Sequence, residues 1–258
     1  MRTIESNFGN DSAGPAVLTD FDDTAAVENV AELLLNQFGD PTWPDVRRRF
    51  RAGELTLNQY QEMTFRNIQA DRATMQSYVK QHANLRPYFK ELWGYCQEHT
   101  IPMAIVSQGL DFYIEALLEK EGFPQVPVHA VNTQFSPTGI TYEYRYAYPG
   151  KEVQGNSKGL IVDSYRQQGY YVIYIGDGMS DFEAAHKADL LFAHRALAEE
   201  CQRRQIPFRR FGDFRDVLQV LQELSPAELS PDGTGPPPGG GDSRNPVADP
   251  RDSEEAPS

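Results

Sequence analysis

Short apolar runs alternate with helix-like segments over most of this chain. The runs have the length and composition of buried strands and lie at residues 16–20, 101–109, 126–135, 170–178 and 190–194. Residues 139–147 also look extended, with Tyr142, Tyr144 and Tyr146 on one face. Alternation of strands and helices favours a parallel sheet covered on both faces. We therefore expect an α/β fold with a doubly wound parallel sheet of the Rossmann-like type.

One region interrupts this alternation, because it contains no convincing strand. Four segments with helical spacing of apolar residues follow one another at residues 28–39, 43–54, 56–69 and 71–82. They lie between the first and second predicted strands. The pattern predicts a core domain formed by residues 1–26 and 83–224, with a helical cap at residues 27–82.

The end of the chain differs in composition. Residues 225–258 contain Pro and Gly runs, no aromatic residue, and seven acids against two arginines, a net charge of −5. Such a segment buries too little apolar surface to offset the entropy of ordering it. We expect a disordered acidic tail.

Charge and hydropathy exclude several classes of partner. The formal net charge is −13, which argues against a broad contact surface for nucleic acid, since that requires clustered Lys and Arg. No apolar stretch reaches the roughly 18 residues of a membrane span, and the N-terminal residues contain no apolar run suited to a signal peptide. We expect a cytoplasmic protein that binds neither nucleic acid nor membrane. The sequence leaves the oligomeric state open.

Polar side chains follow the predicted strands where those strands end, which is where open α/β sheets bind ligands. They are Asp20, Asp22, Ser107, Lys158, Asp177 and Asp181. A few carboxylates suffice to bind Mg²⁺, one carboxylate can accept a phosphoryl group, and a second carboxylic acid can protonate the leaving oxygen. A lysine, a hydroxyl and backbone N–H groups can hold the phosphoryl oxygens. The set therefore matches what phosphoryl transfer needs.

The order of four short motifs resembles that of the haloacid-dehalogenase-like (HAD) phosphatases. The motifs are DFDDT, IVSQG, NSKG and GDGMSD. A helical insert directly after the first motif resembles the first cap type of that superfamily (subfamily IB), as in phosphoserine phosphatases. Residues 85–119 and 175–208 are similar to the methionine-salvage phosphatases that act on 2-hydroxy-3-keto-5-methylthiopentenyl-1-phosphate. The resemblance covers roughly residues 17–224.

This resemblance implies an Mg²⁺-dependent phosphomonoesterase that hydrolyses a small phosphorylated metabolite through an aspartyl-phosphate intermediate. The methylthiopentenyl phosphate is the first candidate substrate, and phosphoserine is the alternative. By motif, Asp20 would be the nucleophile and Asp22 the general acid/base. The Asp20 carboxylate, the Asp22 carbonyl and Asp177 would bind Mg²⁺.

The remaining motif residues take supporting roles by the same resemblance. Those that would bind the transferring phosphoryl group are Ser107, Gln108, Gly109 and Lys158. Asp181 would hold a metal-bound water or orient its loop. Thr24 would contact the metal ligands without binding the metal itself, or would cap the following helix. Two features depart from the family pattern: Asp23 stands where Gly is common, and no cysteine-rich segment precedes the motif lysine.

Other interpretations of these residues stay open. The first acids can form a solvated turn, and Lys151 is a rival to Lys158. A phospho-acceptor signalling domain also uses an acid pair, a phosphorylated Asp, a hydroxyl and a Lys. A catalytically idle scaffold with a partner-binding tail is a third hypothesis. The five histidines show no ligand spacing, so we expect them to be structural or at the surface.

Substrate choice depends on residues of the predicted cap. Phosphoserine would need charged side chains that clamp an amino acid, for which the candidates are Glu28, Arg47, Arg48 and Arg49. A methylthio-sugar phosphate would need an apolar wall, for which the candidates are Leu33, Phe38, Met63, Phe65 and Met75. The basic run at residues 47–51 forms a solvated helix face or guides an anionic substrate.

Overall fold

The computed structural model describes residues 14–136 and 139–223, so the predicted tail at residues 225–258 lies outside the described residues. The strands are β1 (Pro15–Thr19), β2 (Met103–Leu110), β3 (Val128–Ser136), β4 (Gly139–Glu143), β5 (Tyr171–Gly176), β6 (Leu190–Ala193) and β7 (Arg209–Arg210). The helices are α1 (Val30–Phe38), α2 (Trp43–Arg51), α3 (Leu57–Phe65), α4 (Arg72–His82), α5 (Phe89–Glu98), α6 (Asp111–Glu121), α7 (Lys158–Gln167), α8 (Phe182–Lys187), α9 (Arg195–Arg204) and α10 (Phe214–Glu223). Single turns of other helix types are η2 (Phe21–Ala25), η3 (Glu152–Gln154) and η4 (Met179–Asp181).

The strands of the described residues form one sheet in the order β4-β3-β2-β1-β5-β6-β7. Neighbouring strands run parallel except β3 and β4, which form an antiparallel hairpin at one edge. Strand β1 lies between β2 and β5, with Val17 opposite both Met103 and Ile173. The predicted doubly wound α/β fold is confirmed.

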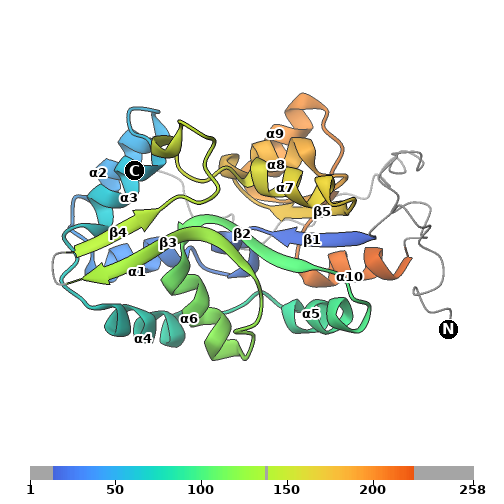
Figure 1. The fold of residues 1–258 in the computed structure, drawn as a ribbon, viewed down its shortest axis with the longest axis horizontal. Helices are drawn as coiled ribbons and strands as arrows, with labels where there is room; N and C mark the ends of the chain where they lie inside the picture. The colour runs from blue at the N-terminus through green and yellow to red at the C-terminus, as the bar shows by residue number, and fades with distance from the viewer. Residues whose placement is uncertain (1–13, 137–138, 224–258) are drawn as a thin grey trace, which may run out of the picture.

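Helices cover both faces of the sheet because successive strand residues point to opposite sides. On β1, Val17 belongs to a large apolar cluster and Leu18 to a smaller one. Helices α5, α6 and α10 contribute to the large cluster, and α7, α8 and α9 to the small one. The two groups of helices lie on opposite sides of the sheet (Figure 1). Such strands must be apolar on both faces, which explains their unbroken apolar runs.

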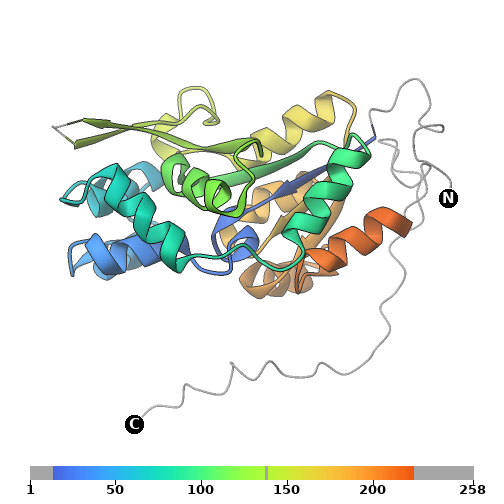
Figure 2. The ribbon, with the colours of Figure 1, turned by 90° about the horizontal axis from the view of Figure 1, so that it is seen from below.

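Helices α1 to α4 form a separate group between β1 and β2 in the chain, at one end of the molecule (Figures 1 and 2). The segments that enter and leave this group pair with each other. Ala26 forms an isolated antiparallel bridge with Leu85, and the N–H of Val27 donates to the carbonyl of Asn84 at 2.9 Å. The chain thus enters and leaves the group through paired segments, and α4 also packs against α6, where Gln76 donates to the carbonyl of Phe112 at 2.9 Å. The assignment of residues 27–82 as a cap domain stays a prediction.

Three local features differ from the sequence predictions. Strand β4 ends at Glu143, because Tyr146 is drawn away: its N–H donates to Asn156 Oδ1 at 3.1 Å and its carbonyl accepts from Ser157. Tyr142 and Tyr144 pack on the large cluster but Tyr146 packs on the small one, so the single tyrosine face was wrong. The two-residue edge strand β7 was not predicted.

None of the helices in residues 14–136 and 139–223 combines the length and the apolar character that a membrane crossing requires. The cytoplasmic location stays a prediction.

We expect the substitution Leu18→Ala to destabilise the fold. Leu18 is fully buried on the central strand, so truncation removes apolar contacts and leaves a cavity. The free energy of unfolding should fall by about 2–5 kcal/mol, as measured by urea denaturation. Met63→Ala is the matched control, because Met63 is 41% exposed. Equal denaturation midpoints for the two variants would contradict this assignment of the core.

Candidate active site

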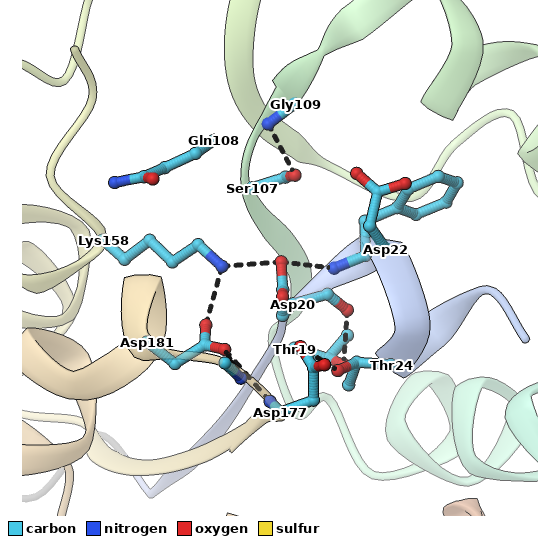
Figure 3. A network of polar contacts seen from close by, with 12 residues as sticks. Thr19, Asp20, Asp22, Thr24, Ser107, Gln108, Gly109, Lys158, Asp177 and Asp181 are labelled. Atoms are coloured by element: carbon cyan, nitrogen blue, oxygen red, sulfur yellow. Dashed lines mark hydrogen bonds and ion pairs between the residues drawn. The ribbon is translucent and has the colours of Figure 1, made fainter. Parts of the chain in front are cut away.

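The parallel sheet brings distant parts of the chain together at the carboxyl ends of its central strands. Asp20 follows β1, Ser107 lies in the last part of β2, and Asp177 follows β5. Lys158 is the first residue of α7 and extends its ammonium group into the same space (Figure 3). These are the side chains predicted from the sequence, and the fold places them around Asp20.

The turn η2 directs the first acids away from β1. Asp20 caps it, and its side chain accepts a hydrogen bond from the N–H of Phe21 at 2.7 Å. Asp23 has a left-handed backbone (φ 61°), a conformation that Gly adopts freely and Asp tolerates. This explains how an Asp can stand where the resembled family commonly has Gly. The Asp23 carboxylate is held by Asn29 at 3.0 Å and by an ion pair with Arg195.

Asp20 is 5% exposed, and one of its two carboxylate oxygens has hydrogen-bond and ion-pair partners. Oδ1 accepts from the N–H of Phe21 and lies 2.7 Å from the ammonium of Lys158, whereas Oδ2 accepts no hydrogen bond from a described residue. Burial raises the pKa of Asp20 well above its ordinary value, and the nearby Asp181 adds to the rise, while Lys158 opposes it. One oxygen is therefore fixed and the other is left to react.

Lys158 joins two buried carboxylates. Its ammonium lies 2.7 Å from Asp20 Oδ1 and 2.6 Å from Asp181 Oδ1, and the side chain is 2% exposed. Burial alone would lower its pKa, but the charges of Asp181 and Asp20 outweigh burial and raise it. Lys158 is therefore a fixed cation inside the site. The rival Lys151 is exposed, with its ammonium 6.0 Å from the Tyr148 ring centroid.

Asp181 is fully committed to hydrogen bonds. Oδ1 accepts from Lys158 and from the hydroxyl of Tyr174, each at 2.6 Å. Oδ2 accepts from the N–H groups of Asp177 and Gly178 at 3.0 and 2.9 Å. Since a carboxylate has about four lone-pair sites, Asp181 organises its neighbours and has no lone pair left for an ion.

Gly176 makes this arrangement sterically possible. A Cβ atom at that position would lie 2.5 Å from Asp181 Cγ, closer than a real Cβ atom approaches. The last residue of β5 therefore has no side chain, so that Asp181 can reach Lys158.

Asp177 is held more loosely than Asp181. Its nearest partners are the hydroxyl of Thr24 at 3.5 Å and the guanidinium of Arg195 at 3.8 Å. Burial, with the charges of Asp181 and Asp23, raises the pKa of Asp177 to about 7. The rise therefore reflects burial first and repulsion by the neighbouring carboxylates second.

The cluster of Asp20, Asp177 and Asp181 could hold a metal ion, since each offers one oxygen and these oxygens lie within 4.8 Å of one another. Hard cations such as Mg²⁺ take carboxylate and carbonyl oxygens and retain water. Because the oxygens of Asp181 are already used, the donors that fit a cation are Asp20 and Asp177. A cation there would offset both the burial and the repulsion that raise their pKa values.

Asp22 lies on the other side of Asp20 from Lys158 (Figure 3). Its Oδ1 accepts from the N–H groups of Val30 and Ala31 at 2.7 and 3.3 Å, and its Oδ2 accepts from the hydroxyl of Tyr113 at 3.0 Å. Burial raises the pKa of Asp22 to about 6, although these hydrogen bonds oppose the rise. Such a carboxyl group can exchange a proton near neutral pH.

The segment after β2 contributes a hydroxyl and backbone groups. Ser107 is 1% exposed, and its Oγ accepts from the N–H of Gly109 at 2.9 Å. The side chain of Gln108 turns toward the Lys158 loop and donates to the carbonyl of Asn156 at 3.0 Å. A phosphate contact by Gln108 would therefore come from its backbone N–H rather than from its side chain.

Several side chains at the site were not found from the sequence. They are Gln61, Arg86, Tyr113, Tyr174, His194 and Arg195. His194 follows β6 directly, so the strand-end rule could have identified it, but it was expected to be structural or at the surface. Its Nε2 lies 3.5 Å from Thr24 Oγ1, and burial, with Arg86 and Arg195, lowers its pKa to about 4. Thr24 faces Asp177 and His194 rather than capping a helix.

Comparisons with known proteins agree with this architecture. A family model described as haloacid dehalogenase-like hydrolase matches residues 17–186. A 2-hydroxy-3-keto-5-methylthiopentenyl-1-phosphate phosphatase from Brevibacillus brevis is 26% identical over 208 residues, covering 80% of this chain and 94% of that protein. A protein of the same name from Exiguobacterium sibiricum is 28% identical, with coverages of 80% and 95%.

Solved structures share the fold at lower sequence identity. A HAD family hydrolase from Salmonella enterica serovar Typhi superimposes with a TM-score of 0.63 at 15% identity, covering 82% of this chain and 74% of that one. A phosphoserine phosphatase solved as a phospho-aspartyl intermediate analogue gives 0.58 at 15% identity, with coverages of 82% and 99%. At such identities the likeness concerns the fold alone.

We expect added Mg²⁺ to stabilise the protein against heat, because a ligand that binds the folded state shifts the unfolding equilibrium. At about 100 times the dissociation constant the gain is about 2.7 kcal/mol, or roughly 5–10 °C in melting temperature. Asp177→Asn should abolish the shift in a calorimetric scan. Asp45→Asn, an exposed position on α2, should retain it. A full shift in Asp177→Asn would contradict the assignment of this ligand.

Proposed function

The chain belongs to the haloacid dehalogenase-like hydrolase family, and from this premise we propose that it is an Mg²⁺-dependent phosphomonoesterase. The resemblance predicted from the four motifs is thereby confirmed at the level of the family. One observation carries the proposal: the ammonium of Lys158 lies between Asp20 and Asp181, while one Asp20 oxygen is left without a hydrogen-bond donor among the described residues. This is the arrangement of an oriented carboxylate nucleophile beside a fixed cation.

The proposed reaction has two steps at phosphorus. Asp20 Oδ2 attacks the phosphorus atom, the ester P–O bond breaks, and Asp22 gives its proton to the departing oxygen. The Asp20 acyl phosphate is then hydrolysed by a water molecule, whose proton returns to Asp22 as the P–O bond to Asp20 breaks. Asp22 thus acts first as an acid and then as a base.

Positive groups and N–H donors hold the phosphoryl oxygens in this scheme. Lys158 is a fixed cation beside Asp20, and Ser107 with the backbone N–H groups of Gln108 and Gly109 would complete the cradle. Mg²⁺, when bound by Asp20, Asp177 and the Asp22 carbonyl, would neutralise phosphate charge. Asp181 would act through Lys158 and the N–H of Asp177, keeping both in place.

Helices α1 to α4 would act as the cap that closes the site. Gln61 on α3 is 4% exposed and donates from Nε2 to the carbonyl of Gln108 at 2.7 Å. Its Oε1 accepts from the hydroxyl of Tyr144 at 3.0 Å. Leu57 on the same helix packs so closely on Gly155 that a Cβ atom there would lie 2.5 Å from Leu57 Cδ2. Helix α3 therefore contacts both the Ser107 segment and the loop that precedes Lys158, where it can exclude water.

The preferred substrate is 2-hydroxy-3-keto-5-methylthiopentenyl-1-phosphate, which the curated relatives are named for. Phosphoserine is less well supported, because the predicted clamp residues have other partners. Glu28 accepts from the backbone and side-chain amides of Asn84. The cap arginines form ion pairs within the cap: Arg47 with Glu32, Arg48 with Asp45, and Arg49 with Glu54.

Most of the side chains predicted to form an apolar wall for the methylthio group are part of the protein core or pack against it. Phe65 and Met75 are buried, and Leu33 and Phe38 pack against the large cluster. Met63 is 41% exposed and stays available to an apolar ligand.

We expect Asp20→Asn to lower the hydrolysis rate of 4-nitrophenyl phosphate with Mg²⁺ by at least about 10³-fold, because removal of a nucleophile costs this much or more. In the parent enzyme, acid quenching during turnover should leave phosphate on the peptide that contains Asp20. Asp163→Asn is the control, since Asp163 pairs with Lys187 on α7 and α8, outside the Asp20 cluster. Undiminished turnover by Asp20→Asn would end the proposal, and a stable phosphoprotein without released phosphate would favour a signalling domain instead.

We also expect kcat/KM for the methylthiopentenyl phosphate to exceed that for O-phosphoserine by at least about 10-fold, a ratio that a few binding contacts can supply. The reason is that the candidate charges for an amino acid already have partners within the protein. Phosphate release measured for both compounds under the same conditions decides the matter. Equal values, or a preference for phosphoserine, would reverse the substrate assignment.

A further inference from the structure

The two oxygens of Asp22 have different surroundings. Oδ1 accepts two N–H groups at the start of α1, those of Val30 and Ala31, so both of its lone pairs are engaged. Among the described residues, Oδ2 accepts one hydrogen bond, from the hydroxyl of Tyr113 at 3.0 Å. A proton carried by Asp22 therefore belongs on Oδ2, and Tyr113 determines which side of Oδ2 is left to hold it.

Tyr113 is held rigidly where it meets Asp22. It is fully buried on α6, and its ring lies 6.0 Å from that of Phe21 and 5.5 Å from that of Phe112, measured between centroids. The hydroxyl fits into the space left by Gly109, where a Cβ atom would lie 1.9 Å from it and 3.1 Å from Asp22 Oδ2. Gly109 thus has two contacts at the site. Its N–H donates to Ser107 Oγ, and its lack of a side chain leaves room for the Tyr113–Asp22 hydrogen bond.

We propose that Tyr113 is a positioning residue for the general acid: its hydroxyl fixes the Asp22 carboxyl so that the proton on Oδ2 faces the departing oxygen. This inference rests on the proposed function. As the ester P–O bond breaks, its electron pair goes to the departing oxygen, the O–H bond at Oδ2 breaks, and the new O–H bond forms on the alcohol. Tyr113 keeps its own proton throughout and does not touch the substrate.

Leaving-group dependence tests this role. Departure of 4-nitrophenolate needs little protonation, whereas departure of an alcohol from an alkyl phosphate needs a proton from the general acid. Tyr113→Phe keeps the ring and removes the hydroxyl. We expect kcat for an alkyl phosphate such as glycerol 1-phosphate to fall about 10-fold, kcat for 4-nitrophenyl phosphate to change less than about 2-fold, and KM for both to stay within about 2-fold.

Two controls separate positioning from a general structural effect. Tyr165→Phe removes another partly buried hydroxyl, one that bonds His129 at 3.2 Å, and should change neither rate. In an Asp22→Asn background, Tyr113→Phe should cause no further loss, since both residues act through the same proton. If Tyr113→Phe melts at a lower temperature than the parent, all rates are compared at a temperature where both proteins are fully folded.

The outcomes distinguish the two proposals. If the parent enzyme hydrolyses neither phosphate, the proposed function fails. If the parent hydrolyses both and Tyr113→Phe slows both equally, or slows Asp22→Asn further by the same factor, the role assigned to Tyr113 is wrong.

Discussion

The buried ammonium of Lys158 between Asp20 and Asp181 is the interaction on which the rest of the site depends. Burying three charged groups is costly unless they pair and hydrogen-bond, and here each has defined partners. Removing any one would leave an uncompensated charge in the interior. The lysine also sets the roles of the acids, because Asp181 is used entirely in holding it, together with Tyr174 and two backbone N–H groups. Asp20 and Asp177 are thereby left with oxygens for a cation and for phosphorus.

The parallel sheet makes this pairing possible. Because β1 lies between β2 and β5, residues separated by more than a hundred positions in the chain meet at the carboxyl ends of these central strands. Apolar clusters on both faces hold the strands, so the polar residues at their ends need not contribute to the core. The chain enters and leaves the helical group α1 to α4 through the paired segments at Ala26 and Leu85, and α4 packs against α6. Its contacts through Gln61 and Leu57 connect it to the same strand ends, and Val30 and Ala31 connect its first helix to Asp22.

The sequence was sufficient for the fold class and for the residues that gather around Asp20, because both follow from strand-and-helix alternation and from polar residues at strand ends. It was not sufficient to identify residues that only position the catalytic or metal-binding side chains. Tyr113 and Tyr174 appear in the sequence as apolar positions of a helix and a strand, and nothing local marks their hydroxyls as partners of Asp22 and Asp181. The side chains of the predicted cap differ from expectation for a related reason. Burial of Phe65 and Met75, and pairing of Glu28 with Asn84, depend on tertiary contacts that spacing alone does not reveal.

In the proposed reaction, Asp20 Oδ2 accepts phosphorus beside a cation held by Asp20 and Asp177. The most direct test is a crystal structure of the protein grown with Mg²⁺ and beryllium fluoride, which imitates a phosphoryl group on a carboxylate. We expect beryllium bonded to Asp20 Oδ2, fluorides facing Lys158 and Ser107, and Mg²⁺ in contact with Asp177. Beryllium fluoride on another residue, or a folded protein whose Asp20 stays unmodified with Mg²⁺ bound elsewhere, would contradict it.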